Sequence, residues 1–238
     1  ECSVMSKKYL GEQIDIHAGG EDLIFPHHEN EIAQSEACND KEFAHYWMHN
    51  GFVNVDNEKM SKSLGNFVTV HDMLKTVDGQ VLRFFLATQQ YRKPINFTEK
   101  AIHDAEVNLK YLKNTHSLPL TEEVSQAELQ AYLDAFQAAM DDDFNTANGV
   151  TVLFDMAKWI NSGNYDETVK DAFEKILQVF GIVFEEETLD EDIEKLIEER
   201  QAARANKDFA TADRIRDELA AQGIKLLDTK EGVRWTRD

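Results

Sequence analysis

The middle of the chain carries the one long pattern that restricts its fold. From Thr98 to Phe180 apolar residues recur every three or four positions, and glycine and proline are scarce. Residues at this spacing share one face of an α-helix, which can be buried against neighbouring helices. The pattern predicts helices at Ala101–Leu112, Leu129–Met140, Asn145–Ile160 and Thr168–Phe180. Four such helices predict a helical bundle over residues 98–184.

An acidic run from Glu185 to Asp192 separates this stretch from a tail of different composition. The chain has 25 lysines and arginines against 45 aspartates and glutamates, a net charge of −20. Residues 200–238 hold nine basic and seven acidic residues, so this segment carries +2 and the preceding residues carry −22. The run is typical of a solvated linker or a capped helix start, and predicts a separate domain over 185–238.

The tail itself predicts a helix pair followed by a hairpin. Helical spacing extends over Asp192–Asn206 and Phe209–Gln222, and Gly223 is placed to end the second helix. Ile224–Asp228 and Gly232–Thr236 are typical of two hairpin strands.

The first 97 residues have a mixed pattern. Gln13–His17 alternate as a short strand does, and Glu29–Cys38 are typical of a helix that begins soon after Pro26. Tyr46–Val55 contain a second short apolar run. Taken together with the segments above, the chain is predicted to be mainly α-helical.

Glu58–Asn66 is the most informative segment for function. Lys59 and Lys62 are interleaved with serines and followed by Gly65, as in an exposed basic loop. Ammonium groups neutralise charge on phosphate oxygens during transfer, and hydroxyls and backbone N–H groups bond to the same oxygens. A bare pair of lysines would more often be a solvated loop. The complete Lys-Met-Ser-Lys-Ser string resembles the signature loop of class I aminoacyl-tRNA synthetases, and this resemblance favours a polyphosphate-binding loop.

Cys2, His27 and Glu31 form a candidate metal site. Residues four apart on a helix share a face, so His27 and Glu31 can reach one ion, and Cys2 would add a thiolate. Nitrogen, oxygen and sulfur donors together suit zinc. By itself the His-His-Glu-Asn-Glu string is more often a polar helix start. His28 points about 100° away from His27 and would face nucleotide or the neighbouring strand.

His17, Gly19, Gly20 and Asp22 follow the first predicted strand. Two glycines allow a ligand to approach the backbone, and a carboxylate just beyond them can accept hydrogen bonds from ribose hydroxyls. A plain strand-to-loop turn explains the same residues.

Together these segments resemble the bacterial cysteinyl-tRNA synthetases, which are class I aminoacyl-tRNA synthetases. The resemblance is carried by Glu1–Ser3, Asp15–Leu23, Phe25–Glu31, Lys59–Ser63, Leu82–Leu86, Tyr91–Phe97, Met140–Thr146 and Arg204–Asp213. It implies that residues 1–97 are the end of an α/β, Rossmann-like nucleotide-binding catalytic domain. Family members also have an upstream half with a His-Ile-Gly-His-type motif and another zinc-binding cysteine, which do not occur here. The resemblance therefore implies a C-terminal half that is inactive alone.

The resemblance also implies the chemistry. One zinc ion per subunit, held by Cys2, His27, Glu31 and the upstream cysteine, would bind the thiolate of substrate cysteine. ATP, with magnesium, would be attacked by the cysteine carboxylate, and the cysteinyl-adenylate would then transfer to tRNA(Cys). Lys62, assisted by Lys59, would stabilise the phosphates. His17 would line the amino-acid pocket, and Gly19, Gly20 and Asp22 the adenosine side.

The near-neutral tail is the expected contact for tRNA, because the acidic excess lies before it. Arg204 and Lys207 are candidates for phosphate contacts, and Arg234 and Trp235 for reading bases. An equally weighted alternative makes Trp235 the apolar plug of a small domain.

Composition and sequence patterns bear on membrane association, cellular location and oligomeric state. No apolar run approaches the roughly 20 residues of a membrane span, the chain opens without a leader-like segment, and Cys2 and Cys38 form no disulfide framework. We therefore expect a cytoplasmic protein, monomeric and without a membrane partner. Two other functions stay open: a mycothiol-type cysteine ligase, which would not need the Arg204–Trp235 module, and a non-catalytic RNA-binding module.

Overall fold

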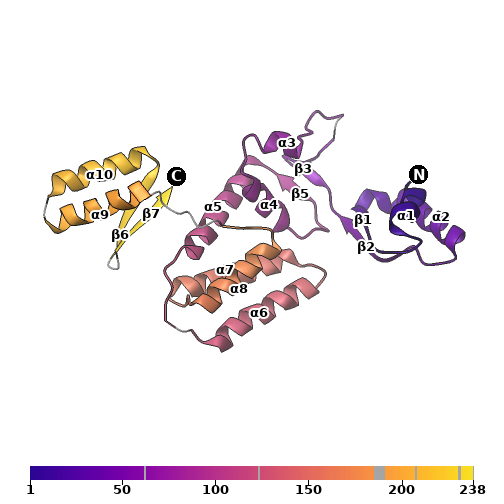
Figure 1. The fold of residues 1–238 in the computed structure, drawn as a ribbon. Helices are drawn as coiled ribbons and strands as arrows, with labels where there is room; N and C mark the ends of the chain where they lie inside the picture. Colours follow the sequence, from indigo (N-terminus) through magenta and orange to yellow (C-terminus); the bar gives the residue numbers. More distant parts are fainter. Residues whose placement is uncertain (62, 123, 185–190, 207, 230–231, 238) are drawn as a thin grey trace. The chain divides into compact units, whose positions relative to one another are not determined.

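The computed structural model describes the chain except for residues 62, 123, 185–190, 207, 230–231 and 238. It divides into two compact units, Glu1–Phe184 and Glu185–Asp238 (Figure 1). The prediction of a mainly helical chain with an α/β beginning, a helical bundle and a terminal helix pair with a hairpin is confirmed.

The first unit begins with two parallel strands joined by a helix. After α1 (Cys2–Leu10), strand β1 (Ile14–Gly20) leads through a 3₁₀ turn (Glu21–Leu23) and a kinked π turn (Ile24–His28) into α2 (Glu29–Asn39) and β2 (Ala44–Asn50). The strands pair from Ile14 opposite Ala44 to Gly20 opposite Asn50. Ile14, Phe43 and Ala44 are buried between the strands and α2, where Ile32 and Trp47 pack against them. Helix α1 was not predicted from the sequence pattern.

A small three-stranded sheet follows. Strand β3 (Val53–Val55) pairs antiparallel with β4 (Glu58–Lys59) and parallel with β5 (Ile95–Phe97). Gly51 lies where the chain crosses Lys93, because a Cβ at Gly51 would be 2.5 Å from the Lys93 carbonyl carbon. Helices α3 (Val70–Met73) and α4 (Gly79–Ala87) fill the connection between β4 and β5.

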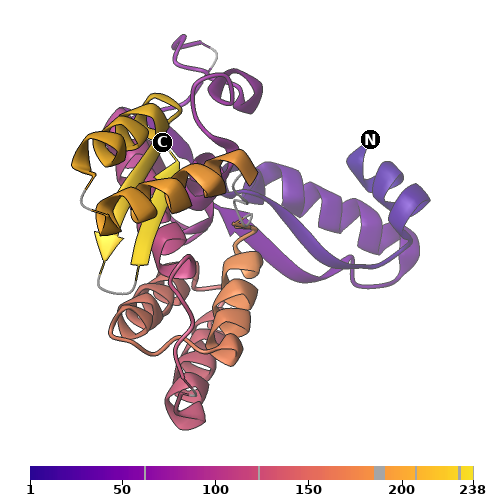
Figure 2. The ribbon, with the colours of Figure 1, turned by 60° about the vertical axis from the view of Figure 1, so that its left-hand side comes forward.

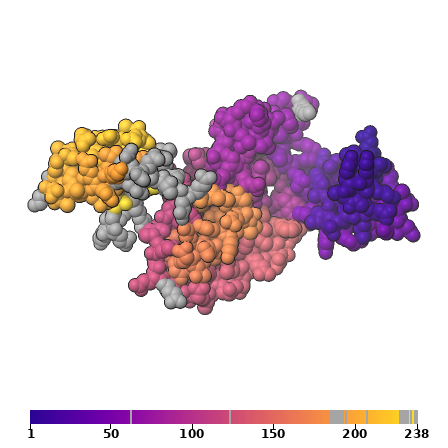
Figure 3. All heavy atoms as spheres, viewed as in Figure 1, coloured from indigo at the N-terminus to yellow at the C-terminus, as the bar shows by residue number. Residues whose placement is uncertain are grey.

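The four helices predicted from periodicity are α5 (Glu99–His116), α6 (Gln126–Asp141), α7 (Thr146–Asn161) and α8 (Glu167–Val179). Thr98, Asn145 and Asp166 cap the first turns of α5, α7 and α8 by accepting hydrogen bonds from backbone N–H groups. The apolar faces meet at fully buried side chains that include Leu112, Leu153, Met156 and Phe173. In the space-filling view the atoms of α6, α7 and α8 abut on the face shown (Figure 3).

Helix α4 joins the same core, which the sequence pattern did not predict. Val81, Leu82, Phe84 and Phe85 of α4 are buried in one cluster with the bundle residues. Asp78 caps this helix by accepting from the N–H groups of Gln80 and Val81. The sheet that carries the lysine loop is therefore built directly on the bundle.

The turn between α6 and α7 makes a polar connection to the segment before β5. Tyr91 donates its hydroxyl hydrogen to Asp143 Oδ1 at 2.8 Å, and Arg92 Nε donates to Asp143 Oδ2. Thr146 Oγ1 donates to the Gln89 carbonyl at 2.9 Å. Asp143 has a φ of 52°, a left-handed conformation that aspartate and asparagine tolerate better than most residues.

The second unit packs two helices against a hairpin (Figure 2). Helices α9 (Glu191–Ala205) and α10 (Phe209–Ala221) precede strands β6 (Ile224–Thr229) and β7 (Gly232–Arg237). Its core consists of Ile193, Ile215, Leu219 and Ile224, with Trp235 packed against them. Gly223 has a φ of 79° where α10 ends, a conformation that favours glycine.

Substituting Asp143→Asn tests the polar connection. The Arg92 and Tyr91 hydrogen bonds hold the pKa of the Asp143 carboxyl below its ordinary value. A lowered pKa in the folded state stabilises the fold above the unfolded pKa, and this contribution disappears as the pH falls through the folded value. We expect the variant to unfold at a lower temperature than the parent at pH 7, with the difference shrinking as the pH falls below 4.

Thermal unfolding measured between pH 3 and pH 7 checks this expectation. Asparagine also tolerates the left-handed conformation, so the change removes the charge and one of the two acceptor oxygens without altering the backbone preference. Asp142→Asn, one position earlier on the same turn, is the matched control. Equal unfolding temperatures for the Asp143 variant and the parent at neutral pH would contradict the role of the connection.

Candidate functional site

The candidate site lies around the C-terminal ends of β1 and β2. Because the two strands are parallel, both end at the same edge, which is the usual position of ligand sites in such sheets. His17 lies opposite Trp47 in the register, and Gly19 lies opposite His49. The pairing therefore gathers His17, Trp47 and His49 beside the π turn that carries His27 and His28.

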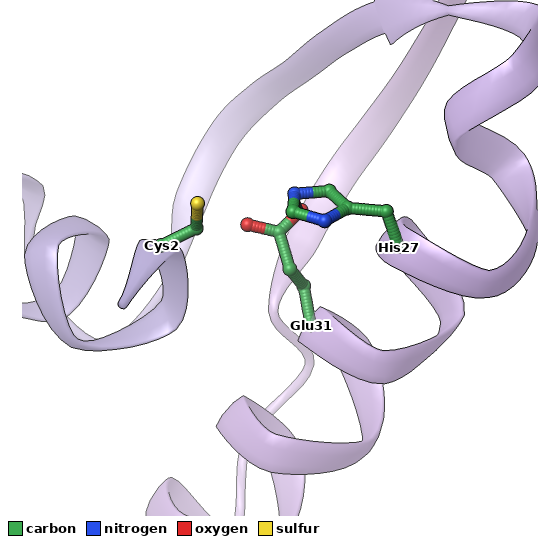
Figure 4. Close-up of side chains that lie close together, drawn as sticks. All are labelled: Cys2, His27 and Glu31. Carbon is green, nitrogen blue, oxygen red and sulfur yellow. Dashed lines mark ion pairs between the residues drawn. The ribbon is translucent and has the colours of Figure 1, made fainter.

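Cys2, His27 and Glu31 converge from three elements (Figure 4). Cys2 begins α1, His27 belongs to the π turn, and Glu31 lies in the first turn of α2. One donor atom from each lies within 4.8 Å of the others, and His27 Nε2 is 3.7 Å from Glu31 Oε2. The three residues proposed from sequence as zinc ligands are thus brought together.

The surroundings of Glu31 fit a cation. The residue is 5% exposed, and its Oε2 atom is buried without a hydrogen bond of acceptable geometry. A buried carboxylate oxygen in this state is costly unless a positive group lies beside it. The thiolate, imidazole and carboxylate donors of Cys2, His27 and Glu31 are the ligand types that would hold a zinc ion here.

His17 also contacts Glu31. Its Nε2 atom is 2.9 Å from Glu31 Oε2, although the angles do not make a hydrogen bond. His17, His28 and Glu31 form a second set of mutually close donor atoms that shares Glu31 with the first. His17 therefore lies beside the candidate metal ligands.

His28 faces the neighbouring strand. Its Nδ1 atom shares a hydrogen bond of 2.9 Å with His49 Nε2, and its ring meets that of His17 edge-on at 4.8 Å. Burial, with His17 nearby, lowers the pKa of His28 below its ordinary value. The sequence left open whether His28 faces nucleotide or the neighbouring strand. In the structure it faces β2.

Gly19 and Gly20 are explained by packing within the chain. A Cβ on Gly19 would lie 2.9 Å from His28 Cε1 and 3.1 Å from Leu23 Cδ1. A Cβ on Gly20 would lie 2.6 Å from Asp22 Oδ1. At Gly19 a side chain would displace the buried His28 ring, whereas at Gly20 the exposed Asp22 side chain could turn away. The approach of the two glycines to adenosine stays a prediction.

The lysine loop is tied to the same strand end. Lys59 Nζ lies 3.9 Å from Asp22 Oδ2 and 3.5 Å from the centre of the Phe52 ring. Asn66 closes the loop, because its Oδ1 accepts from the Ser61 N–H at 2.9 Å and its Nδ2 donates to the Lys59 carbonyl at 3.3 Å. Lys62, the first choice for phosphate contact, lies outside the described residues.

Candidates for RNA contact lie in the second unit. Arg204 is exposed in the last turn of α9. Lys207 and the side chain of Arg234 lie outside the described part of the chain. Trp235 packs against the small core, which favours its interpretation as the apolar plug.

Trp47 and His49 are site residues that were not identified from the sequence. Trp47 stacks with His49 and contacts the rings of His17 and His28. The signal was the alternation within Ala44–Asn50, which places Trp47 and His49 on one face of a strand. This alternation identifies Trp47 and His49 as site residues only when β2 is known to pair with β1.

Three family models match the chain in succession. Residues 1–107 match the catalytic domain of class I (C) tRNA synthetases, residues 135–185 the DALR domain, and residues 186–235 the cysteinyl-tRNA ligase anticodon binding domain.

Curated relatives are similar over all 238 residues. Cysteine–tRNA ligase of Streptococcus thermophilus strain CNRZ 1066 is 94% identical, that of Streptococcus pyogenes serotype M6 78%, and that of Streptococcus agalactiae serotype V 76%. Each match covers 100% of this chain, which spans about half (53%) of the relative.

Solved structures share the fold at low identity. LeuRS of Agrobacterium radiobacter K84, in a ternary complex with tRNA and LeuAMS, has a TM-score of 0.53 at 15% identity, covering 71% of this chain and 27% of LeuRS. A putative arginyl-tRNA synthetase of Campylobacter jejuni has a TM-score of 0.53 at 14% identity, covering 79% and 50%.

Residues 1–107 are thus assigned to the catalytic domain of class I (C) tRNA synthetases. Within this class, the anticodon-domain match and the identity to curated relatives show that the chain belongs to the cysteine–tRNA ligase family.

Proposed function

We propose that this chain is the part of a cysteine–tRNA ligase that holds the metal site, the signature loop and the tRNA-binding tail. The reaction would be ATP-dependent activation of cysteine followed by transfer to tRNA(Cys). The observation that carries the proposal is the convergence of Cys2, His27 and Glu31 at the strand end to which the lysine loop is tied through Asp22. The whole activity would also need the part of the relatives that this chain does not span.

The donor set supports selection of cysteine by sulfur chemistry. Cys2, His27 and Glu31 would hold one zinc ion per subunit, with a further ligand from the rest of the enzyme. When bound, zinc would accept the substrate thiolate far better than the hydroxyl of serine, so discrimination would not need an editing site. His17, which contacts Glu31, would line the amino-acid pocket.

The phosphates of MgATP would be held by the loop. Lys62 would neutralise charge that develops during attack on the α-phosphate, and Lys59, already paired with Asp22, would assist. Gly19, Gly20 and Asp22 would lie on the adenosine side. A Lys59 ammonium group shared between Asp22 and phosphate would link nucleotide binding to the end of β1.

The second unit would contact tRNA. The match of residues 186–235 to an anticodon binding domain supports this role and disfavours a mycothiol-type cysteine ligase, which joins no tRNA. Arg204, Lys207 and Arg234 would make the polar contacts, while Trp235 would support the hairpin from within the core. RNA binding by this unit alone would not require catalysis.

We also propose that the enzyme is monomeric, acts in the cytoplasm and has no membrane partner. Among the described residues, each helix is too short or too polar to cross a membrane.

His27→Ala tests the metal site. The full-length protein is best made as a chimera in which this chain follows the upstream half of the Streptococcus thermophilus ligase. Loss of one ligand from a closed set should lower zinc content and cysteine-dependent pyrophosphate exchange together. Metal analysis by mass spectrometry checks the first and an isotope-exchange assay the second.

His45→Ala is the matched control, since His45 is exposed and pairs with Glu42 away from the cluster. The parent chimera should also bind zinc more tightly than the 238-residue chain, which offers three of the proposed ligands. Unchanged zinc stoichiometry in the His27 variant would remove His27 from the site.

Lys62→Ala and Lys59→Ala separate the two lysines in the same chimera. If Lys62 meets the phosphates chiefly in the transition state, its loss should lower kcat for adenylate formation far more than it raises KM for ATP. The barrier should rise by about 2–4 kcal/mol. Lys59→Ala should be milder, and Lys100→Ala, at an ion pair on the surface of α5, should be neutral. Small and equal effects of both loop variants would indicate a solvated loop.

Deletion of residues 185–238 tests the tRNA-binding tail. Because the compact units divide at this position, the shortened chimera should keep most of its pyrophosphate exchange and lose most of its tRNA charging. Arg204→Ala in the intact chimera should weaken tRNA binding with a reduced salt dependence, because a phosphate contact is lost. Normal charging by the shortened enzyme would rule out the tail as the recognition element.

A further inference from the structure

The lysine loop begins at a turn with an unusual backbone. Asp56 and Asn57 form the two-residue connection between β3 and β4, with Val55 paired to Glu58. Their φ angles are 49° and 69°, both in the left-handed region. Hairpin turns of this kind strongly prefer glycine at the second position, because a side chain there is strained. Aspartate and asparagine adopt this conformation more readily than most residues but at a higher cost than glycine, so contacts from outside the hairpin can stabilise the turn.

Asn96 supplies that support from a segment 39 positions away. Its Oδ1 atom accepts the Asn57 N–H at 2.8 Å, and its Nδ2 group donates to Asn57 Oδ1 at 2.9 Å. The backbone N–H of Asp56 also donates to the Phe97 carbonyl at 3.1 Å. Residues of strand β5 thus accept hydrogen bonds from the backbone N–H groups of both turn residues.

The turn controls the direction in which the loop leaves the sheet. Strand β4 is only Glu58–Lys59, and the Met60 N–H donates to the Val53 carbonyl at 3.0 Å before the chain enters the loop. Asn66 holds the other side of the loop through Lys59 and Ser61. A turn free to change its conformation would release Lys59 from the strand end where Asp22 lies.

We propose that Asn96 is a positioning residue for the lysine loop. Through the paired amides of Asn96 and Asn57 it holds a strained turn, and through the turn it fixes the position of Lys59 and the start of the loop. Asn96 contacts no reacting atom in this scheme. The inference rests on the proposed function only where it concerns catalysis; the restraint on the turn is a property of the fold.

Hydrogen exchange on the 238-residue chain tests the restraint without any activity. Loss of the amide pair in Asn96→Ala should speed exchange at Asn57 and through the loop by about 2- to 10-fold, the range expected for one net hydrogen bond. The matched control is Asn164→Ala, which also removes a half-buried amide with two hydrogen bonds, to Trp159 and Ser162. Unchanged exchange around residues 56–66 in Asn96→Ala would overturn the proposal.

Kinetics of the chimera test the catalytic consequence. Misplaced loop lysines should lower kcat for cysteine-dependent pyrophosphate exchange roughly 10-fold in Asn96→Ala, with the unfolding temperature close to that of the parent. In an Asn57→Gly background, where glycine relieves the strain, the same substitution should cost clearly less. Equal losses in both backgrounds, or none in either, would overturn the assignment.

The two hypotheses fail in different ways. An inactive parent chimera with full zinc content would contradict the proposed function, while the exchange experiment would still decide on the restraint. An active parent with an equally active Asn96 variant would leave the proposed function standing and remove the positioning role.

Discussion

Glu31 is the group on which the arrangement of α1, β1, the π turn and α2 at the candidate site depends. Its buried carboxylate lies within reach of His17, His27 and Cys2, which come from β1, the π turn and α1. A carboxylate removed from water must be stabilised by positive or hydrogen-bonding groups. The three elements are therefore required to place such groups beside Glu31. His17 and His28 are themselves held by ring contacts with Trp47, and His28 also by its hydrogen bond to His49. A metal at this position would satisfy the same requirement and add a site for sulfur.

The lysine loop depends on a different kind of restraint. Exposed lysines lose little free energy when they move, so a loop that must place them needs its ends fixed by the backbone. Asn66 and Asn96 do this at the two ends, each with a side-chain amide that accepts and donates at once. Strand β5, which carries Asn96, continues from the segment bound by Asp143 in the α6–α7 turn. The bundle and the loop are therefore connected through short, specific polar contacts on a common apolar core.

The basic residues of the second unit lie in its later part, because residues 185–199 hold nine acidic residues and one lysine. The acidic excess lies before residue 200, where a nucleic acid would be repelled except at local basic groups. Residues 200–238 are slightly basic, and the small core beneath the hairpin includes Trp235, so the unit can present polar side chains on a stable support. The match to an anticodon binding domain agrees with this division.

Local patterns in the sequence determined the helices of the bundle, the terminal helix pair and the hairpin, because the periods of 3.6 and 2 residues depend only on neighbouring positions. The spacing of His27 and Glu31 likewise predicted that they share a helical face. Only the tertiary structure showed that α4 enters the bundle core, that His28 turns toward His49, and that Asn96 holds Asn57. The two hydrogen bonds join residues 21 and 39 positions apart, and no local period records which strand will pair with which. The parallel pairings of β1 with β2 and of β3 with β5 determine which side chains lie next to each other across the strands.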